Sequence, residues 1–291
     1  MKTSLKLLAI LVIGATARTG QAALLVEETF QGYTAGNLIG QAEQGTGLSG
    51  SWTNPVANGN VTFTVQNSGG MSYSGGNISV NGGSQYGRAS STATVTGNTA
   101  ANIGLSTPLT YNGTGTTYIS FLMRFGGTLE TNDQFSLQLA VADNDTSFSR
   151  TGVRDDTSTA PNDVSFLANN SSSVYPVPEV IVTAGTTYFV VLKLDVGGSG
   201  WTNASLWLDP TQLTEAGEGA ADAIRAQTNN NVLNYLGFKF QQPDSGDSFD
   251  LDEIRIGTTW SDVAVPEPSA WALLAAAGTF FMVFRRRKMN G

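Results

Sequence analysis

Hydrophobic and polar residues alternate with a period of two over several short stretches of this chain. In residues 117–125 the apolar positions are Ile119, Phe121, Met123 and Phe125. In residues 134–142 they are Phe135, Leu137, Leu139 and Val141. Because successive side chains of a β-strand point to opposite faces, each stretch predicts a strand with one face toward a core.

The same pattern continues toward the C-terminus. It predicts strands over residues 187–195, 204–209, 236–241 and 248–257. In the last stretch Phe249 and Leu251 have one parity, whereas Ile254 and Ile256 have the other. A β-bulge at residues 252–253 would turn all four side chains to the same inner face.

Long helical periodicity is almost absent, and the body is rich in Gly, Ser, Thr and Asn. We predict only one short helix, over residues 220–226. Many short strands joined by turns indicate an all-β protein, and the economical architecture is an antiparallel two-sheet sandwich of the jelly-roll type. The Gly-rich region of residues 32–87 reads as irregular and fits this architecture less clearly.

The N-terminus has the three parts of a secretory signal peptide. Lys2 and Lys6 give a positive start, an apolar run follows over residues 7–13, and small residues stand before Ala22 and Ala23. We therefore predict export through the Sec machinery with cleavage between Ala22 and Ala23. Residues 1–22 are then a signal peptide and residues 23–263 the folded body.

Residues 264–291 contain Pro266, Glu267 and Pro268, then an apolar run over residues 270–284, and then Arg285, Arg286, Arg287 and Lys288. The prolines separate this segment from the fold, and the basic cluster is expected to stay cytoplasmic. The order and spacing resemble the PEP-CTERM sorting signal of Gram-negative bacteria. The resemblance implies a transient inner-membrane helix, cutting near residues 266–268 by an exosortase, and a final place in the envelope or extracellular matrix. A plain C-terminal anchor is the alternative.

Charge and composition exclude several kinds of chemistry. Of the 15 basic and 23 acidic residues in the chain, eight basic and 22 acidic residues belong to the body. Such a surface repels nucleic acid, so we expect no nucleic-acid partner. The chain has no His and no Cys. This excludes Ser-His-Asp triads, Cys nucleophiles, a disulfide framework and most zinc sites.

Two acidic turns are candidates for a metal ion. Asp143 and Asp145 follow a predicted strand, and Asp244 and Asp247 lie in a turn between two others. Clustered carboxylates are ligands that calcium prefers, although Asp, Asn, Ser and Gly are also common in plain β-turns. Calcium is therefore the one cofactor that we consider; we predict no other.

Two further features concern carbohydrate. Trp201, in a Gly-Trp-Thr-Asn segment between strands, is either an exposed sugar platform or a core residue, while we expect Trp207 to pack. Asp250 and Asp252 share a face of an unbulged strand and are the nearest approach to a glycosidase carboxylate pair. A solvated strand face with a bulge explains them better, so we predict no catalytic residues.

Three segments resemble the C-terminal half of laminin-G-like, concanavalin A-like jelly rolls. They are residues 185–195, residues 206–210 and the run Phe-Asp-Leu-Asp-Glu-Ile-Arg-Ile-Gly-Thr-Thr-Trp over residues 249–260. The resemblance implies a non-catalytic adhesion or polysaccharide-binding module of a biofilm matrix. One alternative is a glucanase-like carbohydrate-active enzyme on the same fold, and a second is a purely structural or ice-binding coat protein.

Overall fold

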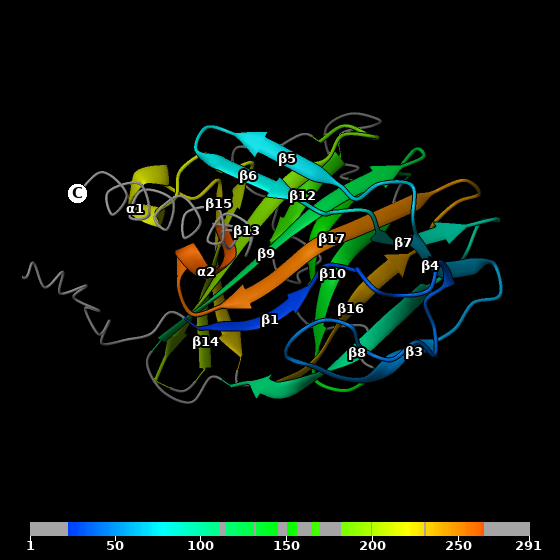
Figure 1. Cartoon of the computed structure of the whole chain (residues 1–291), viewed down its shortest axis with the longest axis horizontal. Helices are drawn as coiled ribbons and strands as arrows, with labels where there is room; N and C mark the ends of the chain where they lie inside the picture. Colours follow the sequence, from blue (N-terminus) through cyan, green and yellow to red (C-terminus); the bar gives the residue numbers. More distant parts are fainter. Residues whose placement is uncertain are drawn as a thin grey trace, which may run out of the picture.

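The body is built almost entirely from antiparallel β-strands. The computed structural model describes residues 23–110, 115–130, 132–144, 150–155, 164–168, 182–198, 200–229 and 231–264. Within them the strands form two large sheets and one hairpin (Figure 1). This agrees with the all-β, two-sheet sandwich predicted from the alternation.

The larger sheet has nine strands. Their spatial order is β15 (Ala223–Asn229), β14 (Gly200–Leu208), β13 (Tyr188–Gly197), β9 (Gly115–Gly126), β17 (Ser248–Gly257), β7 (Tyr86–Ser91), β4 (Val61–Gln66) and β2 (Gly36–Asn37), with β1 (Leu24–Glu28) paired to β17. The smaller sheet has six strands, in the order β12 (Val164–Ala168), β11 (Arg150–Asp155), β10 (Gln134–Ala140), β16 (Leu233–Gln241), β8 (Asn98–Leu109) and β3 (Leu48–Val56). Because the chain changes sheet repeatedly, strands far apart in sequence become neighbours, as in jelly rolls.

The main core lies between the two sheets. Phe238 of β16 is fully buried and has its ring about 6 Å from those of Phe30, Trp52 and Phe63. Every inner-face residue predicted for residues 117–125 belongs to this core. The alternation therefore identified the core side of β9 correctly.

A second apolar cluster covers part of the outer face of the nine-stranded sheet. It joins Leu122, Phe189 and Trp207 of the sheet to Ile78 of a two-stranded hairpin and to Trp260. The hairpin consists of β5 (Ser72–Gly75) and β6 (Ile78–Asn81), and Trp260 begins α2 (Trp260–Ala264) (Figure 1). The expected packing of Trp207 is thus confirmed, but on the outer face rather than between the sheets.

The bulge predicted at residues 252–253 is present. The pairing of β17 with β9 shifts between Asp252 and Arg255, and Glu253 has a φ of 49°. Ile254 and Ile256, which follow the shift, are both buried in the main core. One extra residue changes the parity of the strand, as the sequence required.

Two predictions about secondary structure are wrong. The segment expected to be a helix over residues 220–226 instead leads into β15, which pairs with β14, and the short helix α1 (Glu215–Glu218) precedes it. Pairing with an open strand edge overrides the modest helix propensity of this Ala-containing segment. The Gly-rich region of residues 32–87 is also more regular than expected, since it contains β2 to β6 and the start of β7.

Candidate functional site

The outer face of the six-stranded sheet carries polar side chains. On β10 the main core contains Phe135, Leu137 and Leu139. The residues between them therefore point away from the core. With their neighbours on adjacent strands they form what we call the polar face: Gln134, Ser136 and Gln138 of β10, Arg150 and Arg154 of β11, Lys239 and Gln241 of β16, and Asn102 of β8.

Strand register and hydrogen bonds tie the polar face together. Arg154 lies opposite Gln134, and Lys239 lies opposite Ser136. Nη1 of Arg150 donates to Oε1 of Gln134 at 3.1 Å. The face is therefore a connected layer of hydrogen-bonding groups rather than scattered surface residues.

One hydroxyl of this layer is buried without a partner. Ser136 is 0% exposed, and its Oγ makes no hydrogen bond in the described part of the chain. An unsatisfied buried hydroxyl costs about 1–3 kcal/mol, so such groups usually bind water or a ligand. Gln134, Gln138, Asn102 and Lys239 of the polar face are buried as well, and Arg150, Arg154 and Gln241 are its partly exposed members.

The polar face also concentrates positive charge. Arg150, Arg154 and Lys239 are three of the eight basic residues of a body with 22 acidic ones. Arg154 is partly exposed, forms no ion pair with a described residue, and has a buried Nε without a hydrogen-bond partner. A fork of guanidinium donors without a carboxylate partner is suited to oxygen-rich ligands.

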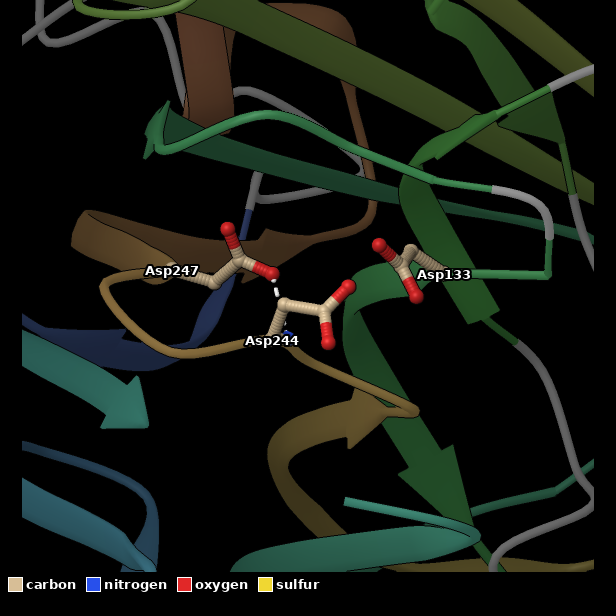
Figure 2. Close-up of side chains that lie close together, drawn as sticks. All are labelled: Asp133, Asp244 and Asp247. Carbon is tan, nitrogen blue, oxygen red and sulfur yellow. Dashed lines mark hydrogen bonds between the residues drawn. The ribbon is translucent and has the colours of Figure 1, made fainter. Parts of the chain in front are cut away.

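A separate group of three carboxylates lies where two loops meet. Asp133 stands just before β10, and Asp244 and Asp247 stand in the turn between β16 and β17 (Figure 2). Each carboxylate offers an oxygen within 4.8 Å of the oxygens of the other two. The structure thus brings together the predicted residues Asp244 and Asp247 and adds Asp133. We call these three residues the acidic cluster.

Burial and mutual repulsion disfavour charge on this acidic cluster. Burial and the repulsion of nearby Asp247, Asp244 and Glu130 together raise the pKa of Asp133 to about 7. Burial likewise raises the pKa of Asp247 to about 6. The backbone amides of Glu130 and Asp244 each donate to one carboxylate oxygen, of Asp133 and Asp247 respectively, at 2.6 Å.

The acidic cluster suits a hard divalent cation. Calcium takes six to eight oxygen ligands, so Asp133, Asp244 and Asp247 would supply only the charged part of its coordination shell. Asp247 also accepts a hydrogen bond from the backbone of Thr128, so the protein itself meets part of the hydrogen-bonding capacity of the cluster. Burial is the main cause of the two raised pKa values, and a cation would offset the repulsion between carboxylates that adds to it.

The second predicted acidic turn does not join this cluster. Oδ1 of Asp143 accepts a hydrogen bond from the hydroxyl of Thr53 at 2.7 Å, and its backbone oxygen accepts one from Asn102 of the polar face. Asp145 lies outside the described residues. Asp143 therefore borders the polar face, and within the described residues it belongs to no group of three carboxylates.

Trp201 is not an exposed platform. It is 2% exposed, belongs to the main core, and donates from Nε1 to the backbone oxygen of Asn231 at 3.0 Å. Trp201 has the parity of Trp207, which alone would turn its ring outward, but the register shifts between Trp201 and Asn203 and turns the ring toward the core. The speculative sugar-binding role of Trp201 is thus wrong.

Asp250 and Asp252 do not line a cleft for glycoside hydrolysis. Asp250 is 1% exposed and accepts hydrogen bonds from Arg88 and Arg124. Asp252 is 0% exposed and accepts from the amides of Met71 and Glu253. Both carboxylates accept hydrogen bonds from protein donors, and their burial shows that the solvated strand face expected from the sequence is wrong, whereas the bulge is present.

The predicted processing residues lie almost entirely outside the described residues. This applies to Ala22, to Pro266, Glu267 and Pro268, and to Arg285, Arg286 and Arg287. Ala23 is described, and its amide donates to the hydroxyl of Thr258 at 3.3 Å. In the described part of the chain, neither helix has the length and hydropathy of a membrane span.

Together these features define an all-β sandwich with a polar sheet face and an acidic loop cluster. No family model matches the chain, and no curated protein matches it. Several solved structures share part of the fold, and three of them are described below.

The first is an endo-β-1,4-glucuronan lyase from the fungus Trichoderma reesei, at 13% identity and a TM-score of 0.42, covering 66% of this chain and 89% of that one. The second is the cellulose-induced protein Cip1, at 12% identity and a TM-score of 0.43, covering 78% of this chain and 98% of that one. The third is the carbohydrate recognition domain of Emp47p, at 9% identity and a TM-score of 0.35, covering 80% of this chain and 97% of that one. At these scores the likenesses assign neither ligand nor activity to this chain.

Sequence reasoning missed both the polar face and Asp133. The signal for the polar face was present, because Gln134, Ser136 and Gln138, together with Lys239 and Gln241, are hydrogen-bonding residues at outward positions. What the sequence lacked was the pairing that places these strands side by side. Asp133 had no such signal, since its partners stand more than a hundred positions later.

Proposed function

We propose that this chain is an exported protein of a bacterial envelope or extracellular matrix, whose sandwich is a non-catalytic module that binds polysaccharide. The polar face is the observation that carries the binding part of this proposal. Among the described residues, its partly exposed Arg154 forms no ion pair, and the hydroxyl of Ser136 beneath the surface has no hydrogen-bond partner. Sugar chains present the complementary hydroxyl and ring oxygens at regular intervals.

The export part rests on the two ends of the sequence. The signal peptide and the PEP-CTERM-like tail support secretion by the Sec machinery, transient anchoring in the inner membrane, and processing by an exosortase. Together with the laminin-G-like segments they favour adhesion within a matrix over an intracellular role.

A glycan array probed with the full-length protein in mild detergent tests the binding proposal. We expect saturable binding to one class of polysaccharide, and about tenfold or greater weakening in Arg154→Gln, because a hydrogen bond to a charged group contributes about 1.5–3 kcal/mol. Arg225→Gln is the matched control. Arg225 is a partly buried arginine of β15 on the other sheet, so binding by this variant should equal that of the parent.

Other results would favour the other readings. Shortening of the bound polysaccharide would indicate a carbohydrate-active enzyme. Absence of both binding and turnover would remove the proposal and favour a structural or ice-binding coat protein.

We further propose that calcium occupies the acidic cluster and stiffens the two loops that meet there. The observation that favours it is the convergence of Asp133 with Asp244 and Asp247, two of which are almost fully buried. The cation would stand where the loop after β9 meets the turn before β17. It would act on stability rather than touch a ligand of the polar face.

Thermal unfolding with calcium and with a chelator tests this second proposal. At a hundred times its dissociation constant a ligand stabilises by about 2.7 kcal/mol, which corresponds to a rise in Tm of about 5–10 °C for a body of this size. Asp133→Asn should abolish most of that rise. Asp143→Asn should keep it, and equal loss in both variants would contradict the assignment.

A further inference from the structure

Two arginines share one carboxylate on the outer face of the nine-stranded sheet. The strand registers place Arg124 of β9 and Arg88 of β7 on either side of Asp250 of β17, with Thr64 of β4 next in the row. Arg88 donates from Nε and Nη2 to the two oxygens of Asp250, at 2.6 and 2.9 Å. Arg124 donates from Nε and Nη2 to Oδ2, at 2.9 and 2.7 Å.

This group has one positive charge more than it has negative charges. The neighbouring carboxyl, Asp252, does not compensate, because burial raises its pKa to about 9 and keeps it protonated at neutral pH. In the other ion-pair networks of the described residues, acidic side chains outnumber basic ones. Lys193 faces Asp195 and Glu215, and Arg255 faces Glu27 and Glu253.

The excess charge is accessible from solvent. The side chains of Arg88 and Arg124 are 30% and 28% exposed, whereas that of Asp250 below them is 2% exposed. Neither Nη1 donates to a described residue, so one donor group of each arginine is left for a ligand. The ring of Tyr86 lies 5.4 and 5.2 Å from the two guanidinium carbons and orients both.

Hydroxyl groups continue the row toward the sheet edge. Thr64 follows Arg88 on β4, and the hydroxyls of Thr62 and Ser90 lie 3.1 Å apart in the next row. Thr62 is exposed and the other two are partly exposed. The β5–β6 hairpin and α2 cover a different, apolar part of this outer face.

We propose that Arg88 and Arg124 form an anion-binding centre that takes a carboxylate or sulfate group of a polysaccharide, and that this centre gives the module a second glycan-binding face. The inference rests on the proposed function for its ligand class. The chemistry that selects the ligand is a pair of fixed guanidinium donors beside a row of hydroxyls, which suits an acidic sugar within a hydroxylated chain.

The two faces point in opposite directions. The polar face is the outer side of the six-stranded sheet, and Arg88 and Arg124 lie on the outer side of the nine-stranded sheet, with the main core between them. One molecule could therefore bind two polymer chains at once. Such a bridge would cross-link a matrix without any enzymatic step.

Calorimetric titration of the full-length protein in mild detergent tests the centre. The probes are an oligogalacturonate, its methyl ester as the uncharged match, and sodium sulfate as a free anion. We expect two oligogalacturonates per protein in the parent and one in the double variant Arg88→Gln/Arg124→Gln. The affinity of the double variant for the methyl ester should be less than twofold below that of the parent. The control variant Arg225→Gln should bind all three probes as the parent does.

Because removal of both arginines leaves Asp250 without partners, a second variant accompanies the first. Arg88→Lys/Arg124→Lys keeps the charges but loses the planar forks, and we expect at least fivefold weaker binding at that site with an intact fold by circular dichroism. If neither Lys nor Gln variants that fold lose a site, the centre is structural and the inference is overturned.

The remaining outcomes separate this inference from the proposed function. Loss of a site in Arg154→Gln alone would leave polysaccharide binding on the polar face and refute the arginine centre. Loss in the Arg88 and Arg124 variants alone would support the centre and refute the polar face. Displacement of the oligogalacturonate by an equal concentration of sulfate would mean a free-anion site and overturn the polysaccharide assignment.

Discussion

Glu28 and Asp252 are fully buried carboxyl groups, an unusual state for acidic side chains. The hydroxyl of Tyr33 donates to Glu28 at 2.6 Å, and the amide of Met71 donates to Asp252 at 2.9 Å. Burial nevertheless raises the pKa of Glu28 to about 7 and that of Asp252 to about 9. The hydrogen bonds only partly offset the loss of solvation.

These pKa values predict a protein that is more stable in mild acid than in base. A carboxyl whose pKa is higher in the folded state binds its proton more tightly there, so the free energy of unfolding falls as pH rises from about 4 to about 9. The slope is at most about 1.4 kcal/mol per pH unit for each group that titrates. Urea unfolding at pH 5, 7 and 9, with a chelator present, measures it.

Asp252→Asn should flatten this pH dependence above pH 7, where Asp252 alone of the two still titrates. The exposed Asp222, changed to Asn, serves as the control and should keep the slope of the parent. A parent whose stability increases steadily up to pH 9 would contradict the assignment of neutral, buried carboxyl groups.

At the scale of elements, α2 closes the outer apolar cluster. The ring of Trp260 packs edge-on against Trp207 at 5.1 Å and lies 6.4 Å from that of Tyr118. The hydroxyl of Ser120 donates to the backbone oxygen of Val263 at 2.8 Å. The end of the described chain is thereby held on the nine-stranded sheet.

Trp260→Ala should release α2 from the nine-stranded sheet. Replacing a buried Trp by Ala costs about 3–5 kcal/mol, since the apolar contacts are lost and a cavity is left. We expect a lower midpoint of urea unfolding. We also expect faster amide exchange in α2 and in the part of β9 that it covers, around Tyr118 and Ser120. Ile224→Ala, at a side chain that is 67% exposed, should change stability by no more than about 0.5 kcal/mol.

The elements also mark where sequence reasoning was sufficient. Alternation predicted β9, β10, β13 and the bulge of β17, because each depends on the position of apolar residues within one strand. It failed for β15, whose Ile224 is exposed and whose strand exists through pairing with β14. A strand at a sheet edge has little apolar pattern to reveal it.

At the scale of the whole molecule, charge is unevenly distributed. The body has 22 acidic and eight basic residues, yet three of the eight lie on the polar face and two more meet at Asp250. A strongly acidic protein therefore has partly exposed arginines on two opposite faces, Arg150 and Arg154 on one and Arg88 and Arg124 on the other, whereas Lys239 is buried. Its overall charge would keep molecules apart in solution, while the two faces remain able to hold oxygen-rich polymers.

The sequence by itself determined the all-β class, the inner face of the main strands and the exclusion of His and Cys chemistry. It also carries the two terminal signals that predict export and sorting. All of these depend on residue types or on local spacing, which need no knowledge of how distant segments meet.

Only the tertiary structure decided which strands are neighbours. That pairing buries Trp201, brings Asp133 to Asp244 and Asp247, assembles the polar face from four strands, and sets Arg88 and Arg124 around Asp250. The physical reason is that alternation fixes the direction of a side chain relative to its own strand. The order of strands in a sheet depends instead on packing and hydrogen bonding between segments far apart in the chain.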